Sequence, residues 1–532
     1  MRLLLVLFAI SLCKASKTPL GAAGNKYFAH LCCTTLSETL PDPAIVHFPG
    51  SAEYEDQQLD YFISQQTELH PSCRVSPTTS SEVSLVVKTL TEHSCPFSVR
   101  SGGHMSWRAS NIARGIALDL GQLNGIDVDE KKGAVRLGPG SNWGRVYTAL
   151  EPYNLSTVGG RVPEVGVGGY FLGGRYISFH VPMDQLDSNH CDDSIGGISL
   201  LSFRHGFGSD NVINYQVVLA NGTLVNANAT SHPDLFWALK LGSTNFGIVT
   251  RFDVFTYPLA EIWSGGRIYA LDPQETPQLL HNWVSFSRKS ASSRGELQAV
   301  VLGKGSVTVW HGSLDPSPSP PLSTATSITD TTRSTTLLKF LDELQPGLGD
   351  QKRTRWFTFT VKLDATFLWD VHSYAREIYD ELGHVSELQW EIAIQPIAKS
   401  FMRASSETGA NPFRNVLMES KEDLALILLI STWRDQSNDK AMYKAMSKLG
   451  AWSEDTARQR RILNNFLYLN YANEEQSVYA RSVNQEDLAR MRRVKKMYDL
   501  DNALGRLWKG GFKIPDDDSD EQGGQSAAHT EL

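Results

Sequence analysis

The chain has 532 residues, of which 41% are hydrophobic and 20% are charged, and its formal net charge is −8. This length exceeds one ordinary hydrophobic core and predicts two domains, with the composition of a soluble globular enzyme. The acidic balance, without a basic stripe, argues against a nucleic-acid partner. After the first residues no apolar run reaches the roughly 18 residues that span a bilayer, so we expect no membrane partner.

The two ends of the chain are unlike a folded core. Residues 1–16 carry one early arginine, a short apolar run and then small residues, which is typical of a secretory signal peptide. A buried first strand is the alternative. We therefore expect a secreted, extracellular protein, in which Asn154, Asn221 and Asn228 are glycosylation acceptors. Residues 516–532 are acidic and almost free of apolar side chains, which predicts a disordered tail.

Cysteines gather near the N-terminus. Removing the signal leaves Cys32, Cys33, Cys73, Cys95 and Cys191. Four of these in the first hundred residues predict two disulfides in an oxidising compartment. The neighbours Cys32 and Cys33 each bridge to Cys73 or Cys95, and the sequence leaves both pairings open. No Cys-x-x-Cys or histidine spacing supports a metal site, so we expect none.

Up to about residue 260 the chain is glycine-rich with short apolar strands. A capping box at Thr79 and Glu82 begins a helix, after which apolar residues recur at helical spacing. A second helix is predicted from about Trp143. Strands are predicted at 96–100, 116–120, 134–137, 216–219 and 247–255.

From about residue 262 strands alternate with helices. Strands are predicted at 267–271, 297–302, 307–311, 356–362 and 424–433. Helices are predicted at 275–289, 336–345, 367–382 and 436–450. This pattern indicates a separate α+β layer, with an antiparallel sheet covered by helices on one face.

The most specific motif is Arg100-Ser101-Gly102-Gly103-His104, directly after a predicted strand. Two adjacent glycines let backbone N–H groups turn inward, and such a nest suits a pyrophosphate. Taken alone, the motif is more often a simple tight turn. The Rossmann fingerprint is absent, which disfavours a Rossmann-type cofactor site.

Further motifs follow in a fixed order. They are Gly138-Pro-Gly140, Val158-Gly-Gly160-Arg161-Val162-Pro163, Gly166-Val-Gly168-Gly169, Gly173-Gly174, His205-Gly-Phe-Gly208, Asp210-Asn-Val212, Asn245-Phe-Gly247-Ile248-Val249, Tyr468-Leu-Asn470-Tyr471 and Gly510-Gly-Phe-Lys513. The series resembles the PCMH-type FAD-binding domain of the vanillyl-alcohol oxidase superfamily. It is most similar to the berberine-bridge-enzyme-like oxidases.

The resemblance implies an α+β fold of three parts. A two-subdomain FAD-binding domain would occupy 25–260, a substrate domain with a helix-covered antiparallel sheet 261–462, and a returning C-terminal segment 463–515. The implied FAD-binding residues are Arg100, Ser101, Gly102, Gly103, His104, Gly160, Val165, Gly166, Gly168, Gly169, Gly173, Gly174, Asn245, Gly247, Ile248 and Val249.

The resemblance also implies how the cofactor is held. In the family, the histidine at the position of His104 bonds to the 8α-methyl group of the flavin. Some members add a cysteinyl link just before Pro-x-Val-Gly, but Val162 stands there in this chain. The resemblance therefore implies FAD with a single covalent link through His104, which makes the flavin a stronger hydride acceptor.

Hydride loss from an alcohol or amine also needs a base for the proton. In related sugar oxidases the last tyrosine of Tyr-x-Asn-Tyr serves, which implies Tyr471 as base with Tyr468 and Asn470 beside it. A strand here would place Tyr468 and Asn470 on one face and Tyr471 on the other, so either a bend or different roles in lining the site must reconcile them. The alternatives are a glutamate, Glu391 or Glu419, as base, or plain core tyrosines.

Residues 175–196 depart from the family pattern by interrupting the glycine loop. A retained intron in the gene or a surface insertion explains this segment better than a metal site, because its His and Asp residues lack ligand spacing.

The resemblance predicts an oxidase that acts, as a monomer, on a small organic substrate, with O2 as reoxidant and H2O2 as product. A secondary-metabolite intermediate is the favoured substrate. An oligosaccharide oxidase is the alternative, and would line an open groove with aromatic side chains such as Trp263, Trp310, Trp356, Trp369 and Trp390. A secreted flavoprotein without turnover is the third possibility, if residues 175–196 disable the cofactor site.

Overall fold

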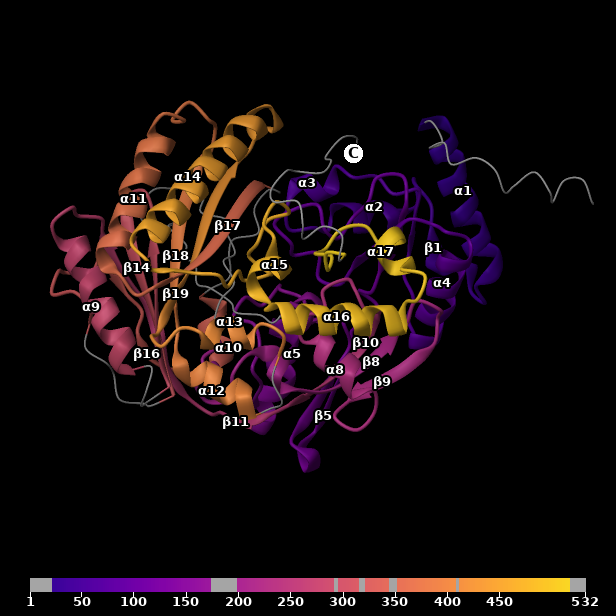
Figure 1. Cartoon of the computed structure of the whole chain (residues 1–532), viewed down its shortest axis with the longest axis horizontal. Helices are drawn as coiled ribbons and strands as arrows, with labels where there is room; N and C mark the ends of the chain where they lie inside the picture. Colours follow the sequence, from indigo (N-terminus) through magenta and orange to yellow (C-terminus); the bar gives the residue numbers. More distant parts are fainter. Residues whose placement is uncertain are drawn as a thin grey trace, which may run out of the picture.

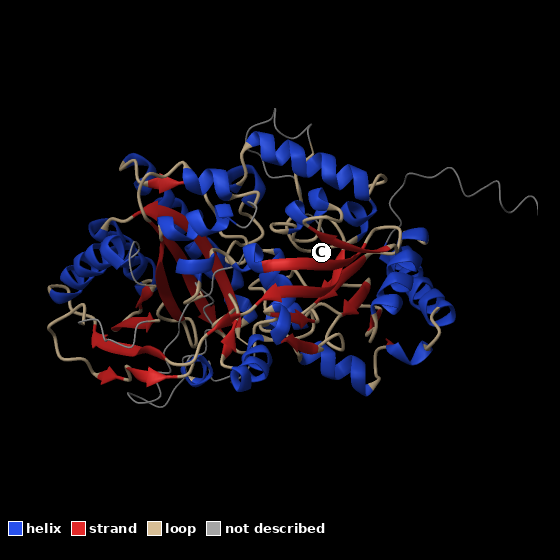
Figure 2. Ribbon diagram, turned by 90° about the horizontal axis from the view of Figure 1, so that it is seen from below, coloured by secondary structure: helices blue, strands red, loops and turns tan. Residues whose placement is uncertain are grey.

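The computed structural model describes residues 22–173, 199–290, 295–314, 321–343, 352–407 and 411–516. It shows the α+β class expected from the sequence, with two groups of strands and helices around both (Figure 2). The predicted signal peptide, Gly174, the interrupting segment 175–196 and residues 517–532 of the predicted tail lie outside the described residues.

The first subdomain is built on a four-stranded sheet in the order β1-β2-β4-β3, in which β4 runs parallel to β2 and β3. Its strands are β1 (Val46–His47), β2 (Cys73–Val75), β3 (Phe97–Arg100) and β4 (Ile116–Asp119). Helices α1 (Ala22–Thr39), α4 (Ser80–Glu92) and α17 (Ala503–Leu507) share its apolar core. The predicted capping box of α4 is confirmed, because Thr79 and Glu82 each bond the other's backbone N–H.

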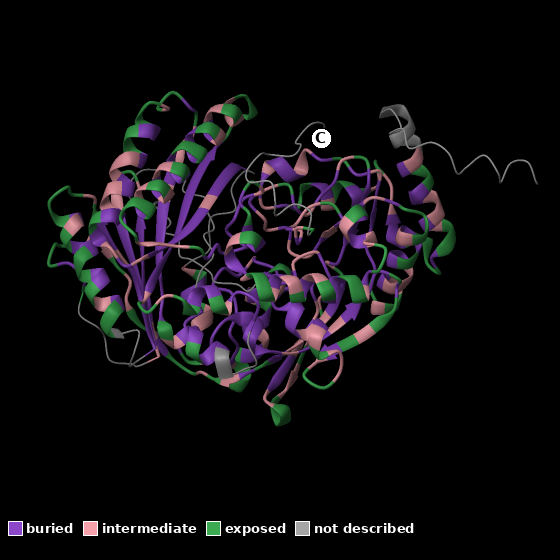
Figure 3. Ribbon diagram, viewed as in Figure 1, coloured by how far each residue is buried: buried purple, intermediate pink, exposed green. Residues whose placement is uncertain are grey.

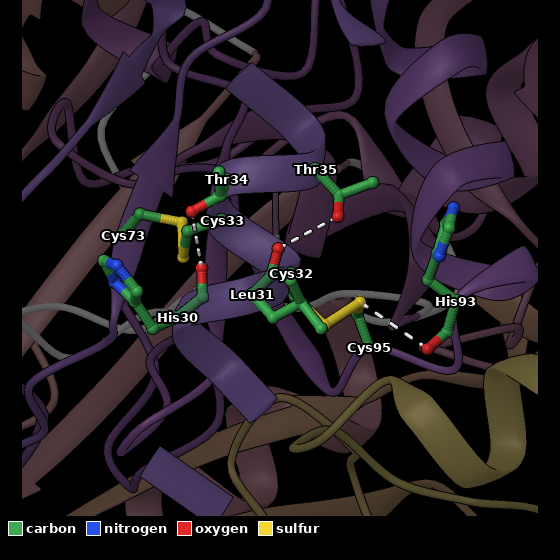
Figure 4. Close-up of a disulfide and its surroundings, with 9 residues drawn as sticks. All are labelled: His30, Leu31, Cys32, Cys33, Thr34, Thr35, Cys73, His93 and Cys95. Atoms are coloured by element: carbon green, nitrogen blue, oxygen red, sulfur yellow. Dashed lines mark hydrogen bonds between the residues drawn. A yellow bond between two sulfur atoms is a disulfide. The ribbon is translucent and has the colours of Figure 1, made fainter. Parts of the chain in front are cut away.

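Two disulfides tie α1 to this sheet (Figure 4). Cys33 bonds Cys73 at the start of β2, and Cys32 bonds Cys95 just before β3. The prediction of two bridges is confirmed, and the structure selects one of the two pairings that the sequence left open. All four sulfur-bearing side chains are buried, so the bridges belong to the core.

The second subdomain is an antiparallel five-stranded sheet in the order β5-β6-β10-β8-β9. Its strands are β5 (Ile126–Asp129), β6 (Ala134–Leu137), β8 (Val212–Val218), β9 (Leu224–Asn228) and β10 (Ile248–Phe255). The helices beside them are α5 (Trp143–Leu150), α6 (Val167–Leu172), α8 (Pro233–Leu239) and α16 (Gln485–Tyr498). Helix α16 comes from the C-terminal part of the chain and lies along this subdomain (Figure 1).

The second domain is a nine-stranded sheet that follows the order β15-β12-β14-β13-β18-β19-β17-β20, with β16 paired to β12. Its strands are β12 (Ile262–Ala270), β13 (Glu296–Leu302), β14 (Ser306–Ser313), β15 (Thr329–Asp330), β16 (Arg333–Thr335), β17 (Arg353–Lys362), β18 (Gln389–Ile397), β19 (Leu424–Trp433) and β20 (Leu463–Asn464). Helices α9 (Glu275–Ser290), α11 (Ala365–Asp380) and α14 (Asp439–Gln459) cover one face (Figure 1).

Both faces of this sheet are buried, and its strands are mostly purple in Figure 3. Along β19, Leu424, Leu426 and Leu428 pack into the core shared with the first domain, whereas Ala425 and Ile427 pack under the helices. Alternate side chains of a strand point to opposite faces, so burial on both sides produces the continuous apolar run that predicted β19. Strand β18 was not among the predicted strands, because Glu391 and Gln395 interrupt its apolar pattern.

No helix in the described ranges is both long and apolar enough to cross a membrane.

Candidate active site

A glycine-lined cavity of about 140 Å³ lies between the two sheets of the first domain. The residues of the predicted site that line it are Ser101, Gly102, Gly103, His104, Gly166, Gly168, Gly169, Gly173, Ile248, Val249 and Asn470. Sequence motifs more than 360 residues apart therefore meet at one cavity.

The other predicted site residues lie behind this wall or beside it. Arg100, Gly160, Val165, Asn245, Gly247, Tyr468 and Tyr471 are buried but do not line the cavity, and Gly174 is outside the described residues. Gly247, at the entry to β10, has φ +147°, and a Cβ there would come 2.6 Å from the Val218 carbonyl oxygen. Glycine is therefore needed at position 247 because of the backbone of the sheet, and not because of direct contact with the cavity.

Two glycine loops cross at the cavity. A Cβ on Gly102 would come 2.6 Å from the Gly166 Cα, and a Cβ on Gly166 would come equally close to the Gly102 Cα. Gly103 adopts φ +66°, in the left-handed region that favours glycine. The crossing brings backbone rather than side chains to the cavity surface, which suits the binding of a phosphate-bearing group.

A buried arginine, Arg100, braces this loop. The Arg100 guanidinium contacts the carboxylates of Asp119, at 2.7 Å, and Asp60. Asp119 in turn accepts a hydrogen bond of 2.8 Å from Gly121 N. The neighbouring Ser101 Oγ donates to the Pro139 carbonyl across the cavity rim. Arg100 thus holds the turn that precedes His104, whether or not it touches a ligand.

His104 is half-buried in the cavity wall. Its ring stacks on Phe62, with centroids 4.0 Å apart and planes 11° from parallel. Phe62 N also donates a 3.3 Å hydrogen bond to Gly103 O, so backbone and ring of Phe62 both hold this turn. Stacking fixes the plane of the imidazole and therefore the direction in which its ring nitrogens point.

The C-terminal segment closes the cavity, and this part of the wall was missing from the predicted site. Trp508, Gly511 and Phe512 line it, together with Ser243 and Thr244 of the turn between α8 and β10. The Gly510-Gly-Phe-Lys513 motif was recognised in the sequence, but only the fold shows that it faces the same cavity as His104.

Asn245 anchors this closure. Its Nδ2 donates to carbonyl oxygens of Gly242 and Phe512 and to the Tyr479 hydroxyl, each at 2.9 Å, and its Oδ1 accepts from Ile514 N at 3.0 Å. Beside it, Lys513 Nζ donates to Thr244 O at 2.9 Å, and burial lowers the pKa of Lys513 to about 7. Asn245 therefore positions the C-terminal wall.

The segment around Tyr471 is a turn and not the strand assumed from the sequence. Tyr471 N and Ala472 N both donate to Tyr468 O at 3.0 Å, which reverses the chain. The rings of Tyr468 and Tyr471 consequently meet edge to face, with centroids 4.7 Å apart, although alternation would have set them on opposite faces. Asn470 points into the cavity wall beside Gly173, where a Cβ on Gly173 would overlap its amide.

The two glutamates considered as alternative bases lie elsewhere. Glu391 is half-buried on β18, paired with Ile430 of β19, and Glu419 is exposed at the C-cap of α13 (Arg414–Met418). Neither side chain lines the cavity. Tyr471 does not line it either, but the turn that bears Tyr471 supplies Leu469 and Asn470 to the wall.

Arg161 joins this tyrosine turn to the second domain. Arg161 Nη2 donates to Gln395 Oε1 at 3.3 Å, and Gln395 Nε2 donates to Tyr471 Oη at 3.2 Å. All three side chains are buried. Burial lowers the pKa of Arg161 to about 9, while the hydroxyls of Tyr471 and Tyr170 act in the opposite direction.

Comparison with known proteins agrees with this geometry. A family profile described as an FAD binding domain matches residues 71–188. The FAD-dependent monooxygenase tpcD of Cochliobolus heterostrophus is 30% identical over 516 residues, which cover 91% of this chain and 94% of the relative. The FAD-dependent monooxygenase FUP4 of Fusarium proliferatum is 29% identical over 93% and 97% of the two chains.

A solved structure shows the same fold. Wild-type BBE-like 1 of Physcomitrella patens superposes with a TM-score of 0.69 at 18% identity, over 91% of this chain and 99% of that one. The fold and site thus define an FAD-linked oxidoreductase with a PCMH-type FAD-binding domain and a berberine-bridge-like substrate domain. This chain belongs to the family that includes the fungal FAD-dependent monooxygenases.

The residues present fit FAD. Gly102 and Gly166 approach too closely for side chains, Gly169 is open to the cavity, and Ser101 to His104 and Gly166 to Gly169 present backbone along its wall. Across the ranges that the structure describes, no three His, Cys, Asp or Glu side chains are grouped to hold a metal ion.

Gly169 allows a direct test of the cavity. A Cβ on Gly169 would meet no other group within 4 Å, so Gly169→Leu should fold, but its side chain enters the space for FAD. Overpacking costs typically 1–3 kcal/mol, so the affinity for FAD should fall roughly tenfold to a hundredfold. The flavin-to-protein absorbance ratio measures this in protein that also carries His104→Ala, so that the expected link at His104 cannot retain the flavin.

Gly305→Leu is the matched control, because Gly305 is equally open but lies in the β13–β14 turn of the second domain. A Gly169→Leu protein with an unchanged flavin content would show that FAD binds elsewhere.

Proposed function

We propose that the protein is a secreted oxidase that removes a hydride from a small organic molecule, an intermediate of secondary metabolism, and carries FAD bonded to His104. The observation that supports this most is the meeting of two motifs at one cavity. His104 lies in its wall, and Leu469 and Asn470, from the turn that bears Tyr471, lie in the same wall. FAD, as hydride acceptor, and Tyr471, as proton acceptor, can thus act on one substrate.

When bound, FAD supplies the hydride acceptor, and O2 reoxidises it with release of H2O2. Tyr471 takes the proton from the substrate heteroatom, and Tyr468 holds the ring of Tyr471 through the edge-to-face contact. The link at His104 replaces one C–H bond of the 8α-methyl group and one imidazole N–H bond with a C–N bond, and the two hydrogens leave with O2 as H2O2. With Val162 in place of a cysteine, the attachment is single.

Burial of the tryptophans supports a small substrate over an oligosaccharide. A sugar oxidase would expose aromatic side chains along a groove, but Trp310, Trp356 and Trp390 are each at most 4% exposed. Trp369 packs against the helix-side core, away from the cavity. Of the five candidates, only Trp263 and Trp369 are partly accessible, so these tryptophans do not form an aromatic platform for a sugar in the part of the chain that the structure describes.

A second candidate, a monooxygenase, is favoured by the names of the relatives, since tpcD and FUP4 are both FAD-dependent monooxygenases. The two reactions differ in where the oxygen atoms go. An oxidase places both atoms of O2 in H2O2, whereas a monooxygenase places one in the product and one in water.

The covalent link is tested by His104→Ala. We expect the wild-type flavin to stay with the protein after acid precipitation, and the peptide containing His104 to be heavier by the mass of FAD less two hydrogens. In His104→Ala the flavin should be released, and its reduction by substrate should slow because the unlinked ring is a weaker acceptor. A wild-type peptide of unmodified mass would refute the link. A colourless protein would favour the alternative of a secreted protein without turnover, in which residues 175–196 disable the cofactor site.

The reaction type is tested with labelled oxygen. Phenolic, alkaloid-like and sugar compounds are first screened for anaerobic bleaching of the flavin, and each active compound is then oxidised under ¹⁸O₂. We expect one H2O2 per product, with all label in the peroxide. One labelled oxygen in the product would establish the monooxygenase instead.

Export and monomeric state are proposed from the sequence ends and the disulfides, and glycan occupancy tests export. Asn154 and Asn221 are exposed, whereas the Asn228 amide is engaged, donating to Asn214 and accepting from Ser231. From a fungal host we expect the medium to contain a monomer that starts after residue 16 and carries glycans at Asn154 and Asn221, with Asn228 bare. Peptide mass mapping before and after deglycosylation measures this, and retention of the chain inside the cell would contradict it.

A further inference from the structure

Three buried polar side chains from distant parts of the chain form one line of hydrogen bonds. Arg161 lies in the loop before α6, Gln395 on β18 of the second domain, and Tyr471 in the turn after β20. Arg161 Nη2 lies 3.3 Å from Gln395 Oε1, and Gln395 Nε2 lies 3.2 Å from Tyr471 Oη. The line crosses from the FAD-binding domain to the substrate domain and ends at the phenol assigned as base.

The chemistry of the donors gives this line one direction. A guanidinium only donates, so the amide oxygen of Gln395 must face Arg161 and its NH2 group must face Tyr471. Gln395 therefore donates to the phenol oxygen, and the proton of that phenol points elsewhere. The charge on Arg161 polarises the amide through its oxygen and strengthens its N–H as a donor.

We propose that Arg161, acting through Gln395, is a positioning residue that holds Tyr471 Oη as a hydrogen-bond acceptor and stabilises its phenolate. This rests on the proposed function, in which Tyr471 accepts the substrate proton. A phenol with an ordinary pKa near 10 is a poor base at neutral pH. A nearby cation and a hydrogen bond donated to its oxygen both favour the ionised form.

The groups around Arg161 leave Tyr471 as the phenol best placed to ionise. Four tyrosines face it: Tyr147, Tyr170, Tyr468 and Tyr471. The Tyr170 hydroxyl donates to Val158 O at 3.1 Å, so its proton is held by a backbone carbonyl. The Tyr468 oxygen accepts from Asn470 Nδ2 at 3.5 Å, a longer bond than the one that Tyr471 accepts from Gln395. Trp356 of β17 packs against Tyr471 and brings no charge.

The experiment reads the ionisation of Tyr471 directly. 3-Fluorotyrosine is placed at position 471 of the full-length, flavin-loaded protein, and its ¹⁹F chemical shift is followed against pH. We expect a midpoint below that of free 3-fluorotyrosine. Arg161→Gln should raise this midpoint by roughly 1 to 2 units, because the cation that favours the phenolate is gone. The midpoint in Arg161→Lys should lie between those of the wild type and Arg161→Gln, since lysine keeps the charge but not the planar guanidinium.

Two further variants control for folding and for charge. Gln395→Leu keeps Arg161 but removes the bridge, and should also raise the midpoint, so the test survives if Arg161→Gln does not fold. Arg145→Gln removes an exposed arginine of α5 and should leave the midpoint unchanged. Flavin absorbance confirms that each variant is loaded.

The outcomes separate this proposal from the proposed function. If the ionisation midpoint of residue 471 does not move in Arg161→Gln or Gln395→Leu, the proposed effect of Arg161 through Gln395 is overturned, whatever the catalytic rate. If the midpoint moves as expected while Tyr471→Phe still reduces its flavin at the full rate, the effect of Arg161 on Tyr471 is supported and the role of Tyr471 as base is refuted.

Discussion

The site depends on the crossing of two backbone loops at Gly102 and Gly166. Any side chain at either position would overlap the other loop, since a Cβ would come 2.6 Å from the facing Cα. Gly166 also bridges to Asn142 at the start of α5, and Ser101 bonds Pro139. The crossing therefore joins the end of β3 in one subdomain to β6, α5 and α6 in the other, and sets the width of the cavity between the two sheets.

Loops of glycine contribute little rigidity of their own, because glycine loses the most conformational freedom on folding. The rigidity comes from what holds them: the ion pairs of Arg100 on one side, the stacked Phe62 on another and the C-terminal wall on the third. The last is held by Asn245, which bonds residues 234 to 269 positions further along the chain. The cavity is thus complete only when the chain has passed through the whole substrate domain and returned.

The sequence predicts best what local forces decide. The capping box of α4 and the bounds of β6 and β19 follow from caps and apolar runs, and the structure has them where predicted. The glycine motifs likewise located most of the cavity wall. Disulfide pairing could not be derived, because it depends on how α1 packs on the sheet.

The turn at Tyr468 and the closing role of Trp508 escaped prediction for a related reason. The residues of the turn alternate like a strand, and it reverses because Tyr468 O accepts from two later N–H groups while Asn470 docks on Gly173. Trp508 and Phe512 could not be assigned to the cavity before the return of the chain was known. Contacts of this kind leave no pattern in the local sequence from which they could be predicted.

Placement of the tyrosine turn finally depends on how the substrate sheet sits on the FAD-binding domain. Most of that interface is apolar, and apolar contact alone is tolerant of small shifts. Polar pairs are less tolerant, because a buried donor that loses its partner costs about 1–3 kcal/mol.

Such pairs lie along the interface between the two domains. Gln65 exchanges hydrogen bonds with the backbone of Thr354 on β17, Arg353 bridges Glu68 and Asp439, and Arg161 meets Gln395. A slide of the sheet would break all three at once. Of these pairs, the one between Arg161 and Gln395 also holds the phenol of Tyr471, which lies behind the wall of the cavity.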